Sequence, residues 1–408
     1  MREEAASIIL AMIFLTFGCQ SNQPKPSSIP EIEIEENTAR VIGLRELFNA
    51  SDLIKLEYSP ESVVGNVELL RYHNGKIYIA SPPEGNEQRD LVIFDAKGSF
   101  ITRIAANGEG PGSIFSTTDF FIARTGHLEI LDRNRRRITR YAPDGSFMEN
   151  IPIPCEGIRF LSLHNQDHVI YRGFAYEFTE PKGIPYNLAR NNANGECKFL
   201  HTLWMHPVFR DRAMDAGDFF FPNPNDNGWF ICDVFNDTIF SLDSDGRIEP
   251  AFKLKTPDRG KKSDFINKLI EVKNRNSDTD FNLRLLELLN DPTIIKKPDL
   301  IMGLPAKEVL ISYRRESKRY FATIDLANET AETFTMESNL LDNWFVFQYD
   351  TDKFAIVINS PIDLSRQLST MPENLAALPE NLRESLQKIN TDVNPYLLVV
   401  KPDALFQN

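Results

Sequence analysis

The chain has 408 residues, of which 42% are hydrophobic and 25% are charged, so it can form a large packed core and wholesale disorder is excluded. Its 58 acidic residues outnumber 45 basic ones, and the net charge of −13 makes a nucleic-acid backbone a poor partner. The 29 Phe, 11 Tyr and 25 Pro residues favour β-structure over helix bundles.

The N-terminus resembles a bacterial lipoprotein signal. An apolar run from Ile8 to Phe17 contains one polar residue and is followed by Gly18 and Cys19. A run of about 10 residues is too short to cross a bilayer, which takes ~20, but suits the core of a signal peptide. We expect residues 1–18 to be a signal peptide and Cys19 to carry a lipid that holds the protein in the bacterial cell envelope, facing the periplasm or the cell surface. The alternative is a buried helix with a chance cysteine.

Residues 19–39 are polar, acidic and contain proline, which predicts a flexible tether. From there one domain is expected over residues 40–408, because a single pattern recurs along them. The segments ILDRNRRRITRYAPDGSF (130–147) and ICDVFNDTIFSLDSDGRI (231–248) align without a gap. Each copy is an alternating apolar strand, a polar turn and the start of another strand.

Six copies are found, anchored near Phe94, Tyr141, Asn191, Leu242, Ile324 and Lys401. Repeats of 40 to 50 residues, each worth about four strands, indicate a β-propeller, so the fold class is all-β with six blades. Residues 259–292 and 370–390 have helical spacing and predict two helical insertions. Residues 40–60 precede the first full copy, and we expect them to close the ring by adding an outer strand to the last blade.

The segment LDRNRRRITRYAPDGSF resembles the NHL-repeat blade through Asp132, Arg137, Ile138, Tyr141 and Gly145. From about residue 40 to residue 406, the chain is similar to bacterial six-bladed β-propeller lipoproteins. That family has a Gly-x-Gly-Pro-Gly-Glu turn after the first blade and an Asn-Asp-Thr-Ile-Tyr strand in a later one. They correspond here to residues 108–113 and 236–240, with Ser and Phe at the last positions. The resemblance implies the fold, and the family's biochemical role is largely undefined.

The stretch ANGEGPGS (106–113) reads as either a phosphate-binding loop or a turn. A P-loop needs Lys and Ser/Thr after its last glycine, at the start of a helix, whereas Ser113 is followed by Ile114 and a predicted strand. We interpret the stretch as the crossing between the first two blades. Whether Glu109 there also contacts a ligand stays open.

Other motifs also have structural readings. His164 and His168 are four residues apart, but in a predicted strand–turn–strand, so we expect hairpin-tip or surface histidines rather than metal ligands. LDSDGR (242–247) lacks the length of a calcium loop and reads as the turn of its repeat. DRNRRR (132–137) could be a basic patch for an acidic partner, but we favour a solvated hairpin. No metal site is expected.

Aromatic residues are concentrated in residues 218–230. Trp204, Trp229 and Trp344 could form a platform for a sugar or a peptide, although packing between blades is favoured. Three cysteines follow the signal segment: Cys155, Cys197 and Cys232. One disulfide among them is allowed, and the sequence does not select the pair.

The expected function is a lipid-anchored binding or scaffold module that presents propeller loops to an envelope protein, a peptide or a glycan, without a cofactor. Hydrolase motifs are absent, which argues against an enzyme. The candidate ligand-binding residues are Asp119, Glu109, Trp204 and Trp229. The alternative is a calcium-dependent lactonase- or esterase-like hydrolase that uses the propeller channel, as some six-bladed propellers with NHL-like blades do. It needs several inward Asn, Asp or Glu residues, of which Asp119 is the best candidate.

Overall fold

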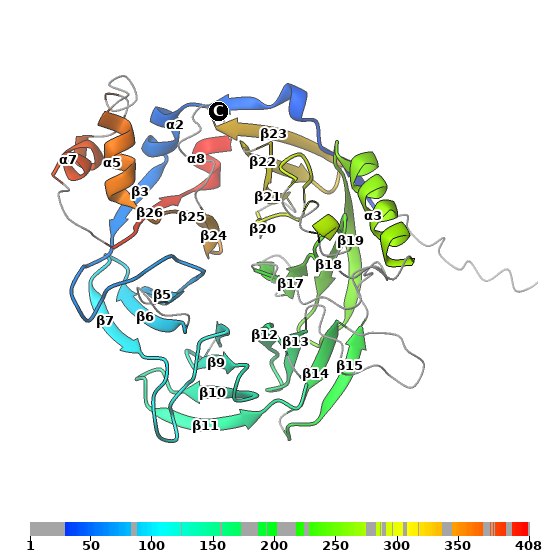
Figure 1. The fold of residues 1–408 in the computed structure, drawn as a ribbon. Helices are drawn as coiled ribbons and strands as arrows, with labels where there is room; N and C mark the ends of the chain where they lie inside the picture. The colour runs from blue at the N-terminus through cyan, green and yellow to red at the C-terminus, as the bar shows by residue number, and fades with distance from the viewer. Residues whose placement is uncertain are drawn as a thin grey trace, which may run out of the picture.

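The structure is a computed structural model. It describes residues 29–82, 88–123, 125–155, 157–172, 187–192, 194–201, 218–223, 228–274, 283–285, 287, 291–295, 297–304, 308–316, 318–336, 345–369, 376, 378, 380–388 and 394–406. The strands of these residues form six sheets arranged in a ring around a central axis, as Figure 1 shows; we call the region around this axis the channel. The expected six-bladed β-propeller is therefore confirmed.

Each blade is an antiparallel sheet whose strands follow one another in chain order from the channel to the rim. Blade 1 consists of β4 (Leu69–His73), β5 (Lys76–Ser81), β6 (Asp90–Asp95) and β7 (Phe100–Ile104). Blade 2 consists of β8 (Asp119–Ile122), β9 (Leu128–Asp132), β10 (Arg137–Tyr141) and β11 (Phe147–Pro152). Blade 3 consists of β12 (Arg159–Ser162), β13 (His168–Tyr171), β14 (Leu188–Asn191) and β15 (Cys197–His201). Blades 4 to 6 consist of β16 (Phe220–Asn223), β17 (Gly228–Ile231), β18 (Thr238–Leu242) and β19 (Ile248–Lys255); β20 (Leu300–Gly303), β21 (Glu308–Arg315), β22 (Lys318–Asp325) and β23 (Thr330–Met336); and β24 (Phe345–Asp350), β25 (Lys353–Ile358) and β26 (Tyr396–Val400).

The sequence repeat corresponds to the third strand of each blade and the turn after it. Five of the six anchors lie in third strands, and Lys401 directly follows β26. In the turn after β18, the Asp243 Oδ1 atom accepts hydrogen bonds from the backbone N–H groups of Asp245 (2.9 Å) and Arg247 (2.8 Å). Gly246 has a φ of +87°, a conformation that glycine adopts without strain. LDSDGR is therefore a turn, as its place in the repeat predicted.

The core lies between neighbouring blades rather than in one central cluster. A separate group of buried apolar side chains fills each of the six gaps between blades. For example, the Tyr78 and Phe120 rings meet between blades 1 and 2, and the Phe321 and Phe354 rings meet between blades 5 and 6. Central strands such as β5, β6, β9 and β25 are almost entirely buried because both faces of each sheet are covered.

The N-terminal residues wrap around the rim of three blades. Strand β3 (Ser51–Lys55) pairs antiparallel with β26 in blade 6, which confirms the predicted ring closure. Before it, β2 (Arg40–Ile42) pairs parallel with β23 in blade 5, and β1 (Glu31–Glu33) pairs parallel with β19 in blade 4. We call residues 31–55 the strap.

The prediction of a flexible tether over residues 19–39 is wrong for residues 31–38. This first part of the strap is folded onto the propeller. Ile32 and Ile34 are buried among side chains of blades 4 and 5. A short helix, η1 (Glu36–Thr38), follows them, and Glu36 is ion-paired with Arg315 of β21. The acidic residues, on which the tether prediction was based, alternate with the buried isoleucines.

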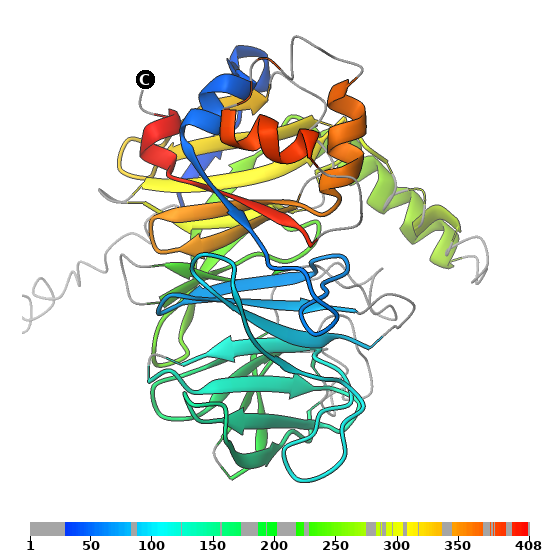
Figure 2. The same cartoon turned by 90° about the vertical axis from the view of Figure 1, so that its left-hand side faces the viewer.

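Helices lie at two places on the rim. The first insertion begins with α3 (Arg259–Asn274), whose Leu269 is buried beside Phe235 of blade 4. The second insertion begins earlier than expected, and contains α5 (Pro361–Ser369) and α7 (Glu380–Gln387). Figures 1 and 2 show them near two helices that the sequence did not predict, α2 (Leu44–Asn49) and α8 (Pro402–Phe406). No helix among the described residues is long and apolar enough to cross a membrane.

The structure settles the pairing of the three cysteines. Cys155, in the crossing between blades 2 and 3, forms a disulfide with Cys197 of β15. Cys232 is a buried free thiol, and burial raises its pKa to about 12. A thiol held in its protonated form is unreactive, so Cys232 acts as a small core residue.

Candidate functional site

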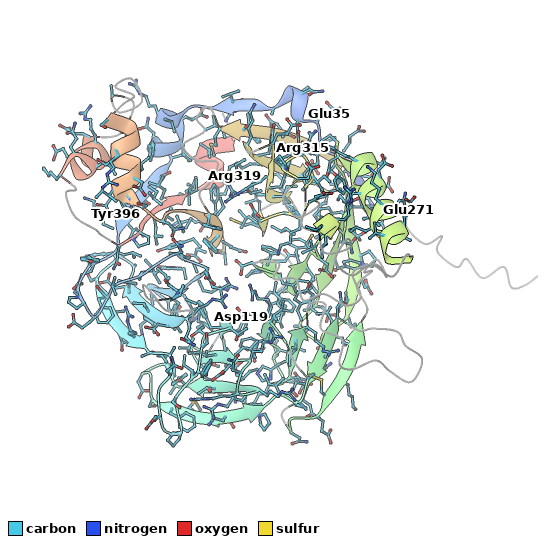
Figure 3. The ribbon with its side chains drawn as sticks, in the orientation of Figure 1. Glu35, Asp119, Glu271, Arg315, Arg319 and Tyr396 are labelled. Atoms are coloured by element: carbon cyan, nitrogen blue, oxygen red, sulfur yellow. A yellow bond between two sulfur atoms is a disulfide. The ribbon has the colours of Figure 1, made fainter. Side chains whose placement is uncertain are left out.

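Charged side chains from several blades meet in the central channel. The inner strands β4, β8 and β12 bring Arg71, Asp119 and Arg159 to the channel, while Asp218 lies just before β16. In Figure 3, Asp119 is labelled close to the centre of the ring. Asp119 and Arg159 are buried, which is rare for charged side chains, so they mark this region as a candidate site.

Arg71 connects two carboxylates across the channel. Its Nη2 atom lies 2.8 Å from Oδ1 of Asp218 in blade 4 and 3.8 Å from Oδ1 of Asp119 in blade 2. The Arg71 guanidinium also lies 5.7 Å from the ring centre of Phe120. These contacts hold the side chain in one orientation, and they join blades that are distant in sequence.

Asp119 is the most strongly perturbed carboxyl group in this arrangement. Burial raises its pKa to about 6, although Arg159 and Arg71 act in the opposite direction. Its Oδ2 atom accepts a hydrogen bond of 2.9 Å from the backbone N–H of Phe160. Within the described residues, its Oδ1 atom has no hydrogen-bond partner.

The segment that carries Asp218 is fixed from both sides. The ring of the next residue, Phe219, stacks on Tyr171 with 3.6 Å between ring centres. The Tyr171 hydroxyl donates a 2.7 Å hydrogen bond to the buried carboxylate of Asp233. On the other side, the ammonium group of Lys297 donates to the backbone carbonyl of Asp218, and burial lowers the pKa of Lys297. Asp218 is therefore held in place before any ligand arrives.

A pocket of about 190 Å³ lies beside the Arg71–Asp218 ion pair. Three inner strands contribute to it, from blades 1, 4 and 6. Its lining residues are Arg71, Tyr72, His73, Asp218, Phe220, Phe221, Pro222, Gln348, Tyr349, Asp350 and Thr351. Tyr72 and Tyr349 stack on each other with 4.4 Å between ring centres, so part of the wall is flat and aromatic.

Two polar atoms of the pocket residues are buried without a hydrogen-bond partner in the described part of the chain: Nε2 of His73 and Oε1 of Gln348. Burial lowers the pKa of His73, against the opposing effect of Asp350, so its imidazole is neutral at pH 7. Buried polar groups are usually paired in folded proteins. Both residues line the pocket, so a ligand could satisfy these atoms if the side chains turned toward it.

The predicted site residues lie in different places. Asp119 is at the channel, one ion pair away from the pocket. Glu109 is exposed in the crossing from β7 to β8. Trp229 lies in β17 and packs, partly buried, against the cluster between blades 3 and 4, which matches the packing interpretation. Trp204 and Trp344 lie outside the described residues, as does Cys19.

The stretch ANGEGPGS is the crossing between blades 1 and 2, as predicted. It follows β7 and precedes β8, and the Tyr141 hydroxyl donates a 2.6 Å hydrogen bond to the Gly112 carbonyl. Arg135 and Arg137 donate to the carbonyl of Ser113, with distances of 2.9 Å and 2.5 Å. Two arginines of the DRNRRR hairpin thus hold this loop in place.

The interpretation of the two histidines needs one correction. They do lie in a hairpin, with His164 exposed in the turn between β12 and β13. His168 is fully buried, however, and its Nε2 atom lies 3.1 Å from Oε2 of Glu129 in the neighbouring blade. It is an interblade contact rather than a surface residue, because the first residue of β13 faces blade 2.

Within the described residues, no three His, Cys, Asp or Glu side chains form a group that could hold a metal ion. Asp119 and Asp218 instead both lie near the Nη2 atom of Arg71. Arg71 is thus paired with both carboxylates rather than free.

Sequence patterns missed most of the pocket. Arg71 and Asp218 are 147 residues apart, and they belong to no common motif. The repeat is strongest in third strands, whereas the pocket is formed by first strands. One signal was available: the sequence LLRYH places a charged residue inside a short apolar strand.

Comparisons with known proteins support the fold. A family model described as "Domain of unknown function (DUF4934)" matches residues 29–401. No curated protein matches the sequence. A crystal structure of a "putative exported protein" from Bacteroides fragilis NCTC 9343 has a TM-score of 0.65 at 16% identity, and the match covers 92% of this chain and 99% of that chain. A member of the DUF4221 family from Bacteroides vulgatus has a TM-score of 0.50 at 13% identity, covering 86% and 95% of the two chains. Identities this low show a shared fold alone.

Proposed function

The chain belongs to the DUF4934 family, and from the geometry of its channel we propose that it is a binding module whose pocket holds a small polar group of a ligand. The observation that carries this proposal is the pocket between blades 1, 4 and 6. Two of its lining residues, His73 and Gln348, each have a buried polar atom with no hydrogen-bond partner among the described residues. Aromatic walls combined with a few polar groups in fixed positions are typical of ligand sites.

The pocket residues are held in position by the fold itself. Arg71 is fixed by Asp218, and Tyr72 by its stacking on Tyr349. A site that is already ordered loses little conformational entropy when a ligand binds. This arrangement supports binding, and it requires no rearrangement of the blades.

The hydrolase alternative has less support from the channel. A calcium ion needs six to eight oxygen ligands, several of them carboxylates. The positively charged guanidinium of Arg71 pairs with both Asp119 and Asp218, and it would repel such an ion. We therefore favour binding over calcium-dependent hydrolysis.

We further propose that the protein works in the cell envelope, held there by lipid on Cys19. The apolar segment that precedes Cys19 supports export, and so does the Cys155–Cys197 disulfide, because disulfides persist mainly in exported proteins. Cys19→Ala should then move the protein from the membrane fraction to the soluble fraction. Unchanged fractionation would refute the lipid anchor without affecting the pocket.

The binding proposal is tested with a panel of small polar compounds that contains sugars, amino acids, short peptides and dicarboxylates. A compound that binds the folded state raises the melting temperature, and this is measured for the wild type and for Gln348→Met. The matched control is Gln387→Met, which changes an exposed glutamine on α7. At least one compound should raise the melting temperatures of the wild type and the control by more than it raises that of Gln348→Met. If no compound in the panel does so, the binding proposal is wrong.

A further inference from the structure

We infer that the pocket binds one neutral sugar ring, either a free monosaccharide or the end unit of a glycan. This inference rests on the proposed binding function and narrows it to one chemical class. It follows from three properties of the pocket: the charges along its wall, the hydrogen-bonding capacity of its polar atoms, and its shape.

The charges of the lining disfavour a charged ligand of either sign. Asp218 and Asp350 oppose an anion, and a cation would compete with Arg71 for Asp218, its ion-pair partner. The lowered pKa of His73 agrees with this, since burial already disfavours a positive charge at that position. A neutral ligand avoids both conflicts and the cost of removing a charged group from water.

The hydrogen-bonding capacity calls for groups that both donate and accept. The Oε1 atom of Gln348, which has no partner among the described residues, can only accept hydrogen bonds. The carboxylates of Asp218 and Asp350 are likewise acceptors only. The Arg71 guanidinium can only donate, and a neutral imidazole such as His73 provides one donor and one acceptor. A hydroxyl group serves both kinds of partner, whereas an ammonium group only donates and a carboxylate only accepts.

The shape is suited to a single ring. The volume of about 190 Å³ is below the roughly 300–1,000 Å³ of pockets for drug-sized ligands. Tyr72, Tyr349 and Phe220 give the wall apolar surface, against which the C–H face of a sugar can pack. Hydroxyl groups at the edge of such a ring would then point toward Gln348, His73 and Asp218.

The test is a calorimetric titration of the full chain with single compounds of known charge. The probes are glucose, galactose, mannose and N-acetylglucosamine as neutral sugars, glucuronic acid as an anionic sugar, and lysine and glutamate as charged ligands without a ring. We expect at least one neutral sugar to bind, and Gln348→Met and His73→Phe to weaken its affinity at least tenfold. The controls Gln387→Met and His164→Phe, which change exposed residues, should leave the affinity unchanged.

The outcomes separate this inference from the broader proposal. Tighter binding of lysine, glutamate or glucuronic acid than of every neutral sugar, lost in the same variants, would overturn the sugar assignment and keep the pocket. Binding of no probe would overturn the sugar assignment. A neutral sugar that binds equally to the pocket variants would place its site elsewhere. The far-UV spectrum and melting temperature of each variant show that it is folded, and Tyr72→Leu offers a second test of the same wall if either variant is not.

Discussion

At the scale of single residues, the channel depends on one arginine. Arg71 is the shared partner of Asp119 and Asp218, which come from blades 2 and 4. Its side chain is 26% exposed and those of the two carboxylates are 2% and 9% exposed, so water screens this ion-pair network only in part. A partly buried charge that loses its partner is costly, whereas an exposed pair contributes little.

Arg71→Met should therefore lower the free energy of unfolding by about 1–3 kcal/mol, measured by guanidinium denaturation at pH 7. The control is Arg366→Met, because Arg366 pairs with Asp363 while 71% exposed. Its effect should stay below about 0.5 kcal/mol. If both substitutions lowered the free energy of unfolding equally, the ion pairs of the channel would contribute no more to stability than an exposed pair.

Asp119 predicts a pH dependence with a defined sign. Its pKa of about 6 in the folded state exceeds the ~3.9 expected for an unfolded chain, so the folded protein holds this proton more tightly. The contribution of protonated Asp119 to the free energy of unfolding is fully present below about pH 4, and it is lost as the pH rises through 6. Asp119→Asn removes the titration.

Between pH 4 and pH 7, the wild type should therefore lose about 2 kcal/mol of unfolding free energy relative to Asp119→Asn. Urea denaturation of both proteins across this range measures the difference. A difference that stays constant with pH would mean that Asp119 titrates normally.

At the scale of elements, the first part of the strap, residues 31–38, is the part of the fold that the sequence least suggests. Strand β1 has three residues, two of them glutamates, and only Ile32 and Ile34 indicate that one side is buried. The strap adds strands to blades 4 and 5 and closes blade 6. Covering these edges removes backbone groups that would otherwise be free to pair with other chains.

Substitution of a single strap residue tests this role. Ile32 is fully buried, so Ile32→Ala should cost about 2–4 kcal/mol in guanidinium denaturation. Ile29→Ala, at a residue that is 41% exposed, should cost less than about 0.5 kcal/mol. If both substitutions were neutral, residues 29–38 would behave as the tether that their composition predicts.

The Cys155–Cys197 disulfide is the second element that can be tested. It closes a loop with a sequence separation of 42, for which chain entropy predicts a stabilisation of about 4 kcal/mol. Cys155→Ala combined with Cys197→Ala should lower stability by about 2–4 kcal/mol. A reducing agent should lower the melting temperature of the wild type but leave the double variant unchanged, and a wild type insensitive to reduction would contradict the bond.

At the scale of the whole molecule, the sequence predicted the architecture better than the site. The turn after each third strand is local: Asp243 and Gly246 specify it within a few residues, and its recurrence reveals the blades. The pocket is not local, since Arg71, Asp218 and Gln348 come from three blades and are brought together by closure of the ring. Asp119 could be proposed because it begins an inner strand, but nothing in the sequence links it to Arg71.

A crystal structure with the tightest-binding sugar of the panel would show whether the channel pocket holds a neutral sugar ring. We expect the ring to lie between blades 1, 4 and 6, with hydroxyl groups within hydrogen-bond distance of Gln348 and His73 and one face against Tyr72 or Phe220. A sugar bound elsewhere on the molecule, with this pocket free of it, would refute the proposed sugar site.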